Sequence, residues 1–268
     1  MQKVYTALTQ KGVNFIETSE SYSIAEGLLN KFMEEVDAPP DYKPIITTTF
    51  SNPWKMALRN KSLPRRGAKA IVDAAEASAK RLGIDSLDVY QVQNPGLYIG
   101  GMKAIANGLL DTIGDDHTRY IGCVNWSVPK LQKLQYYLDE IDGAEFIATN
   151  QFDFSITNRK NLKMIEACKK MGITPICTNV LDGGLASGMY TSLNPTGDKA
   201  PEKEGDMGPF KVKKLEALDM LFKAMEKMAA DVSKRVADRL KKFGKDGVSV
   251  CVIQCIISED IAMFVALL

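Results

Sequence analysis

The chain has 268 residues, enough for one large barrel or two small domains. Hydrophobic residues make up 45% and charged residues 25% of it, which is ordinary for a globular protein. The formal net charge of +1 predicts no broad attraction to nucleic acid or anionic lipid, and no apolar run reaches the ~18 residues that a membrane span needs.

Short apolar, β-branched runs alternate with longer segments of helical periodicity. The first twelve residues form a helical pattern without the apolar core of a signal peptide. The predicted strands are Asn14–Thr18, Pro44–Phe50, Leu87–Gln93, Tyr120–Trp126, Phe146–Asp153, Thr174–Val180 and Ala262–Leu268. The predicted helices are Ile24–Val36, Gly67–Leu82, Met102–Ile113, Pro129–Leu138, Asn158–Met171 and Val212–Phe243.

This alternation predicts a parallel sheet covered by helices. Seven strands favour an α/β fold of the TIM type, a (β/α)8 barrel formed by residues 1–268 as one domain. A doubly wound open sheet is the second choice, weakened because no G-x-G-x-x-G follows an early strand. The chain starts on the helix that should follow a first strand, so we expect that strand to be missing from this sequence. A segment outside the sequence, or a partner, would then cover the open edges.

Two polar segments carry further expectations. Residues 191–210 are rich in Pro, Gly, Asp, Glu and Lys, and they predict a mobile surface loop that is either a lid over a ligand or a plain insertion. Arg59, Lys61, Arg65 and Arg66 crowd what we interpret as another loop. That loop is either a solvated surface or a contact for phosphate or an acidic partner.

The cysteine and histidine content predicts no metal site. The five cysteines are an odd number without a C-x-x-C pair, so we expect reduced thiols in a reducing compartment. The single histidine, His117, is expected on the surface.

Five segments, taken in order and spacing, resemble the aldo-keto reductase family. They are Phe15–Tyr22 with Glu26 beyond it, Arg81–Gln91, Arg119–Ser127, Asn150–Ser155 and Asp182–Tyr190. The corresponding family patterns are F-x-D-T-A-x-x-Y-G-x-x-E, R-L-G-x-D-x-x-D-L-Y-Q, R-Y-I-G-x-S-N-x-S, N-Q-x-x-Y-S and G-G-G-L-L-T-G-K-Y. Asn94–Tyr98 and Tyr190–Pro195 are further similar to plastid oxidoreductases of this family.

The resemblance implies an NADP(H)-dependent barrel that reduces carbonyls by hydride transfer, with an Asp, Tyr, Lys and His acting together. Here the Tyr position keeps Tyr22, whereas the Asp position holds Glu17, the Lys position Thr49 and the His position Gln93. A phenol with a pKa near 10 needs a neighbouring cation to act as an acid near neutral pH. Because threonine carries no charge, Tyr22 is either a catalytic proton donor with an unusual helper or a half-buried aromatic at a strand end.

The resemblance also places cofactor contacts. Asn125 and Gln151 stand where family members hold the nicotinamide carboxamide, and they alternatively satisfy backbone groups at strand ends. Thr178 replaces the aromatic residue that stacks on the nicotinamide ring. Leu181 and Gly183 are expected to let backbone N–H groups approach a pyrophosphate.

These replacements predict a non-catalytic member of the family, serving as a subunit of an assembly or as a ligand-binding scaffold, with NADP(H) as a possible ligand. The alternative is an active NADP(H)-dependent oxidoreductase in which Tyr22 donates the proton. A protein partner or larger assembly is expected at the open edge of the barrel. The resemblance implies a chloroplast or other plastid location, with the cytoplasm as the alternative.

Overall fold

A computed structural model describes residues 2–22, 24–141, 145–187, 189–197, 210–211 and 213–223. The predicted strand Ala262–Leu268 and most of the loop at 191–210 lie outside the described residues. The described chain forms two compact units, one made of residues 2–154 and 159–178 and one of residues 155–158 and 179–223. The prediction of a single domain over residues 1–268 stays a prediction.

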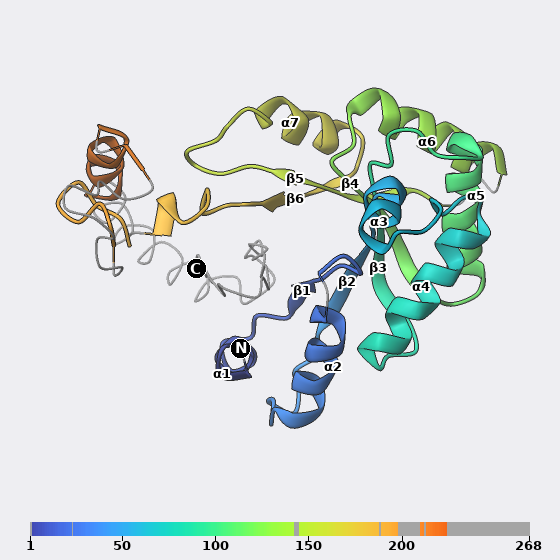
Figure 1. Cartoon of the computed structure of the whole chain (residues 1–268), viewed down its shortest axis with the longest axis horizontal. Coiled ribbons are helices and arrows are strands. Elements are labelled where there is room, and N and C mark those ends of the chain that lie inside the picture. Colours follow the sequence, from blue (N-terminus) through green and yellow to red (C-terminus); the bar gives the residue numbers. More distant parts are fainter. Residues whose placement is uncertain are drawn as a thin grey trace, which may run out of the picture. The chain divides into compact units, whose positions relative to one another are not determined.

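The first unit is built on one parallel sheet whose strands follow one another in chain order (Figure 1). The strands are β1 (Phe15–Glu17), β2 (Ile45–Phe50), β3 (Leu87–Gln93), β4 (Thr118–Val124), β5 (Ile147–Asp153) and β6 (Thr174–Thr178). The predicted α/β class is confirmed, and six of the seven predicted strands are present within a few residues of their expected bounds. Sequential parallel neighbours are the pattern of a (β/α) barrel wall, and they contradict the order of a doubly wound sheet.

The helices of the first unit are α1 (Gln2–Gln10), α2 (Ala25–Glu35), α3 (Pro53–Asn60), α4 (Lys69–Leu82), α5 (Gly101–Gly114), α6 (Val128–Ile141) and α7 (Leu162–Lys170) (Figure 1). Helix α1 precedes β1, the others lie in the connections between strands, and α4, α5 and α7 contact the strands of the sheet. All the predicted helices up to α7 are confirmed. No helix in the described ranges is both long and apolar enough to cross a membrane.

The two faces of the sheet differ because side chains alternate along each strand. The face toward the helices carries buried apolar residues of the core, such as Phe50, Tyr90 and Val92. The opposite, inner face carries polar residues at paired register positions. Glu17 pairs with Thr47, and the next step along the strands aligns Thr49, Gln91, Gly122 and Thr149.

Helix α3 corrects the interpretation of the basic segment as a loop, since Arg59 lies in its last turn. The Asn52 side chain accepts hydrogen bonds from the backbone N–H groups of Trp54 and Lys55, and Pro53 occupies the first helical position. This pairing of an N-cap asparagine with proline is a sequence signal for a helix start.

The second unit has its own small apolar cluster of Leu185, Leu215 and Leu218. Residues 213–223 are helical, as the predicted helix Val212–Phe243 requires over the part that is described. At the start of the predicted loop 191–210, Ser192 donates from its backbone N–H and its hydroxyl to Asp219 on that helix.

Candidate functional site

Glu17 and Tyr22 form the centre of the candidate site. Glu17 ends β1 on the inner face with 4% of its surface exposed, and Tyr22 follows in the loop before α2. The Tyr22 phenol and the Glu17 carboxylate share a hydrogen bond. Burial first, and then the negative charge and hydrogen bond of Glu17, raise the pKa of Tyr22 well above its ordinary value of 10.

Thr49 and Gln93 occupy the inner face at the ends of β2 and β3. The Thr49 hydroxyl is buried, and it finds no hydrogen-bond partner among the described residues. Gln93 accepts a hydrogen bond of 2.9 Å from the Asn52 backbone N–H, which fixes its side chain to the loop before α3. The structure therefore brings these positions to the same face as Glu17, but neither supplies the charge of a lysine or an imidazolium.

The two expected carboxamide contacts lie on neighbouring strands, Asn125 just after the end of β4 and Gln151 within β5. Asn125 is exposed and adopts a left-handed conformation with φ of 60° immediately after β4, which asparagine tolerates better than most residues. Gln151 is buried on β5, where its Oε1 accepts a hydrogen bond of 2.9 Å from Gln91 Nε2. Gln91 also accepts from the Thr149 hydroxyl at 3.2 Å. Gln151 is thus oriented by a side-chain network, and not by backbone groups as its alternative interpretation required.

The Thr178 side chain links the end of β6 to the end of β5 by a hydrogen bond. Its hydroxyl donates to Asp153 Oδ1 at 2.8 Å, and the Phe154 backbone N–H donates to its carbonyl oxygen at 3.0 Å. A short, hydrogen-bonded side chain at this position offers no ring for stacking against nicotinamide.

Leu181 and Gly183 belong to the second unit. Both lie in a tight turn in which Asp182 and Gly183 have φ angles of 50° and 66°. The Gly183 backbone N–H already donates to the Asn179 side chain at 3.1 Å. In this structure the Gly183 N–H is therefore used in a hydrogen bond inside the second unit, and a pyrophosphate would have to replace that bond.

Three of the five cysteines and the single histidine lie in the described ranges, whereas Cys251 and Cys255 lie outside them. Cys123 and Cys168 are buried and Cys177 is half-buried, and none of the three is in a disulfide. His117 is half-buried before β4, less exposed than expected. No cluster of three ligating His, Cys, Asp or Glu side chains occurs in the described part of the chain.

An ionic clamp beside Tyr22 was not predicted. Glu20, in the loop that carries Tyr22, accepts hydrogen bonds from both terminal nitrogens of Arg65 at 2.5 and 2.8 Å, and from the Ser51 backbone N–H at 2.7 Å. The Arg65 guanidinium also lies 4.1 Å from the centre of the Phe50 ring. The clamp therefore ties the loop to the end of β2 and to the segment before α4. The basic cluster of the sequence contains Arg65, but no local pattern indicates its partner Glu20, which lies 45 residues away.

A second pair holds the helices behind the site. Glu26 is buried at the start of α2, and it accepts 2.6 Å hydrogen bonds from Arg81 Nε on α4 and from the Thr48 hydroxyl on β2. Glu26 and Arg81 both lie in the segments that resemble the family patterns. Those patterns mark the two positions, but nothing in the sequence indicates that the two side chains form an ion pair.

The sequence profile of the aldo/keto reductase family matches residues 1–251. The chain belongs to the aldo/keto reductase family. Among curated proteins, it is 24% identical over 212 residues to the chloroplastic pyridoxal reductase of Arabidopsis thaliana, covering 75% of this chain and 55% of that protein. It is 30% identical over 105 residues to an aldo-keto reductase of Mycolicibacterium paratuberculosis, covering 38% of this chain and 35% of that protein. The chain thus spans about half or less of the length of these relatives.

Solved structures of aldo-keto reductases share the fold. The Bombyx mori enzyme in complex with NADP superposes with a TM-score of 0.54 at 17% identity, over 66% of this chain and 55% of that one. The Klebsiella pneumoniae enzyme in complex with NADPH gives 0.55 at 19% identity, over 70% and 62%. These neighbours bind NADP(H), and their fold implies that the six strands are part of a (β/α)8 barrel.

Proposed function

We propose that this protein is a non-catalytic member of the aldo/keto reductase family, which binds a ligand or serves as a scaffold without reducing a carbonyl. One observation carries the proposal. The Tyr22 phenol is hydrogen-bonded to the Glu17 carboxylate, and no cation of the described residues is among the causes that shift its pKa.

The pKa of Tyr22 explains why this arrangement opposes proton transfer. A proton donor works best when its pKa lies near the working pH. Burial and Glu17 both move the pKa of Tyr22 upward, away from neutrality. A higher pKa makes the Tyr22 phenol a weaker proton donor at neutral pH.

The side chains fit only part of a nicotinamide cofactor. Asn125 is exposed, and Gln151 Nε2 makes no hydrogen bond to the described residues, so both amides have groups to offer a carboxamide. Thr178, bonded to Asp153, gives no stacking surface. The cofactor, if bound, would supply the hydride, while these two amides would bind and orient its carboxamide. This partial fit supports the second candidate, an active NADP(H)-dependent oxidoreductase with Tyr22 as proton donor.

Binding and turnover separate the two candidates. NADPH titration, followed by tryptophan fluorescence, measures binding. Oxidation of NADPH with an aromatic aldehyde measures turnover. The proposal expects the wild-type protein and Tyr22→Phe to show the same rate as a protein-free control, whether or not NADPH binds. A wild-type rate above that control, which falls in Tyr22→Phe, would establish the oxidoreductase instead.

We further propose a plastid location and a protein partner. The location is supported by the chloroplastic relative from Arabidopsis. A partner surface is supported by Leu58 on α3 and Leu97 before α5, which are 82% and 76% exposed. Import of a fluorescent fusion into isolated plastids, and light scattering of the native protein with co-purifying chains, test these proposals.

A further inference from the structure

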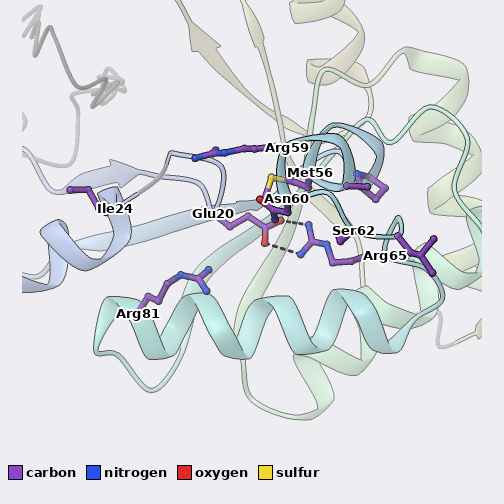
Figure 2. A pocket seen from close by; sticks show the side chains of 11 residues that line it. Glu20, Ile24, Met56, Arg59, Asn60, Ser62, Arg65 and Arg81 are labelled. Carbon is purple, nitrogen blue, oxygen red and sulfur yellow. Dashed lines mark hydrogen bonds and ion pairs between the residues drawn. The ribbon is translucent and has the colours of Figure 1, made fainter.

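A cleft in the first unit adjoins the loop that carries Tyr22, but neither Tyr22 nor Glu17 lines it (Figure 2). Its volume is about 480 Å³, within the range of small-molecule sites. The loop before α2, helix α3, the segment that follows it and helix α4 form its walls. The lining includes Glu20, Met56, Arg59, Leu63, Arg65 and Arg81.

The three arginines of this cleft are not equally neutralised. Arg65 is held by both oxygens of Glu20, so this pair contributes no net charge. Arg59 donates one hydrogen bond of 2.6 Å to the Ser21 carbonyl oxygen. No carboxylate among the described side chains lies within ion-pair distance of Arg59. Its positive charge therefore remains available to a ligand.

Arg81 adds further donors. Its Nε donates to Glu26 and its Nη2 to the Ser78 hydroxyl at 2.9 Å, while Nη1 makes no bond to a described residue. The side chain is 43% exposed. Figure 2 shows Arg59 coming from α3 and Arg81 from α4, with the pair of Glu20 and Arg65 drawn between them.

Apolar side chains complete the walls. Leu63 is 86% exposed, Ile24 is 63% exposed, and Met56 is half-buried on α3. Apolar groups open to water beside the Arg59 guanidinium, which has no carboxylate partner among the described side chains, favour a ligand with an anionic head and an apolar body.

We propose that this cleft binds a small phosphate monoester with an apolar or aromatic body. A phosphate monoester is dianionic near pH 7 and has three acceptor oxygens. It can therefore meet the uncompensated charge of Arg59 and also accept from Nη1 of Arg81, whose own charge Glu26 balances. The guanidinium fork also suits the spacing of phosphate oxygens. This proposal does not depend on whether Tyr22 is catalytic, because the cleft uses different side chains.

Calorimetric titration with phenyl phosphate tests the site. The matched variants are Arg59→Gln, Arg59→Lys and Lys55→Gln. Lys55 is exposed on the same helix but does not line the cleft, so its variant removes an equal charge elsewhere. We expect Arg59→Gln to weaken phenyl phosphate binding by about ten-fold or more, Arg59→Lys to weaken it less, and Lys55→Gln to leave it unchanged.

Titration with inorganic phosphate measures the affinity due to the phosphate group, and titration with phenol measures the affinity due to the aromatic ring. We expect each to bind more weakly than phenyl phosphate. Circular dichroism checks that each variant folds. No binding of phenyl phosphate at about 10 mM, or equal binding by Arg59→Gln and the wild-type protein, would overturn the site. Equal affinity for inorganic phosphate and phenyl phosphate would overturn the assigned ligand class.

Discussion

Two ion pairs of equal length should differ sharply in their contribution to stability. Arg65 and Glu20 approach to 2.5 Å, and so do Lys69 and Asp73 on α4. The side chains of the first pair are 29% and 8% exposed, and those of the second are 85% and 55% exposed. The shortest N–O distance is the same in both pairs, whereas burial and the number of hydrogen bonds to the carboxylate differ.

Replacing Glu20 with glutamine leaves the Arg65 charge without its partner. Removing one member of a buried ion pair commonly costs about 3–5 kcal/mol. The partial exposure of Arg65 lets water solvate the remaining charge, which places our expectation near the lower end, at about 3 kcal/mol. The exposed pair is screened by solvent and salt, so Asp73→Asn should produce no resolvable change.

Urea unfolding of both variants measures the difference, with the free energy extrapolated to water and the m-value held as a check on two-state behaviour. The double variant Glu20→Gln, Arg65→Gln should cost less than the sum of its two single variants, because the unpaired charge is gone. Equal losses from Glu20→Gln and Asp73→Asn would refute the reasoning. An additive double variant would show that the two residues of the clamp do not interact.

Further predictions concern the sheet, the core and the buried titratable groups. Gly122→Ala would place a methyl carbon 2.0 Å from the Thr149 hydroxyl oxygen, so urea unfolding should show a loss of about 1–3 kcal/mol that Thr149→Ala in the same chain partly restores. Leu134→Ala truncates a fully buried side chain, and the same assay should show a loss of about 2–5 kcal/mol. Burial raises the pKa of Tyr98 from 10 to about 12. The neutral phenol therefore contributes fully to the free energy of unfolding below pH 10, and this contribution is lost as the pH rises toward 12. Tyr98→Phe should lose less stability than the wild-type protein over that range, and equal slopes would contradict this assignment. Burial also raises the pKa of the Cys123 thiol, which should react with a thiol reagent at neutral pH only as fast as the protein opens.

The strands were predictable because their pattern is local. The predicted strand Leu87–Gln93 has the same bounds as β3, because the polar turns on both sides of this apolar run define where the strand begins and ends. The strand before Asn125 was predicted two residues too far along the chain. Its end depends on the left-handed conformation at Asn125, which a β-propensity pattern does not report.

The candidate site was predictable only in part. The period of two along a strand places Glu17 and Thr49 on one face once the strand register is known. The hydrogen bond between Glu17 and Tyr22 depends on how the loop after β1 folds back, which no local pattern specifies. The clamp of Glu20 and Arg65 joins residues 45 positions apart, and such a pairing requires tertiary structure.

Buried hydroxyl groups on the inner face of the sheet distinguish a pure scaffold from a protein that binds a ligand there. Thr47 and Thr49 are buried there with hydroxyl groups that find no partner among the described residues. Each such group costs about 1–3 kcal/mol unless water or a ligand meets it. A protein that needed only its scaffold would be more stable with valine at both positions. We therefore expect Thr47→Val and Thr49→Val to stabilise the protein if this face is dry, and to destabilise it if bound water or a ligand is displaced. An increase in the free energy of unfolding would show that the inner face is dry, and a decrease would show that it holds water or a ligand.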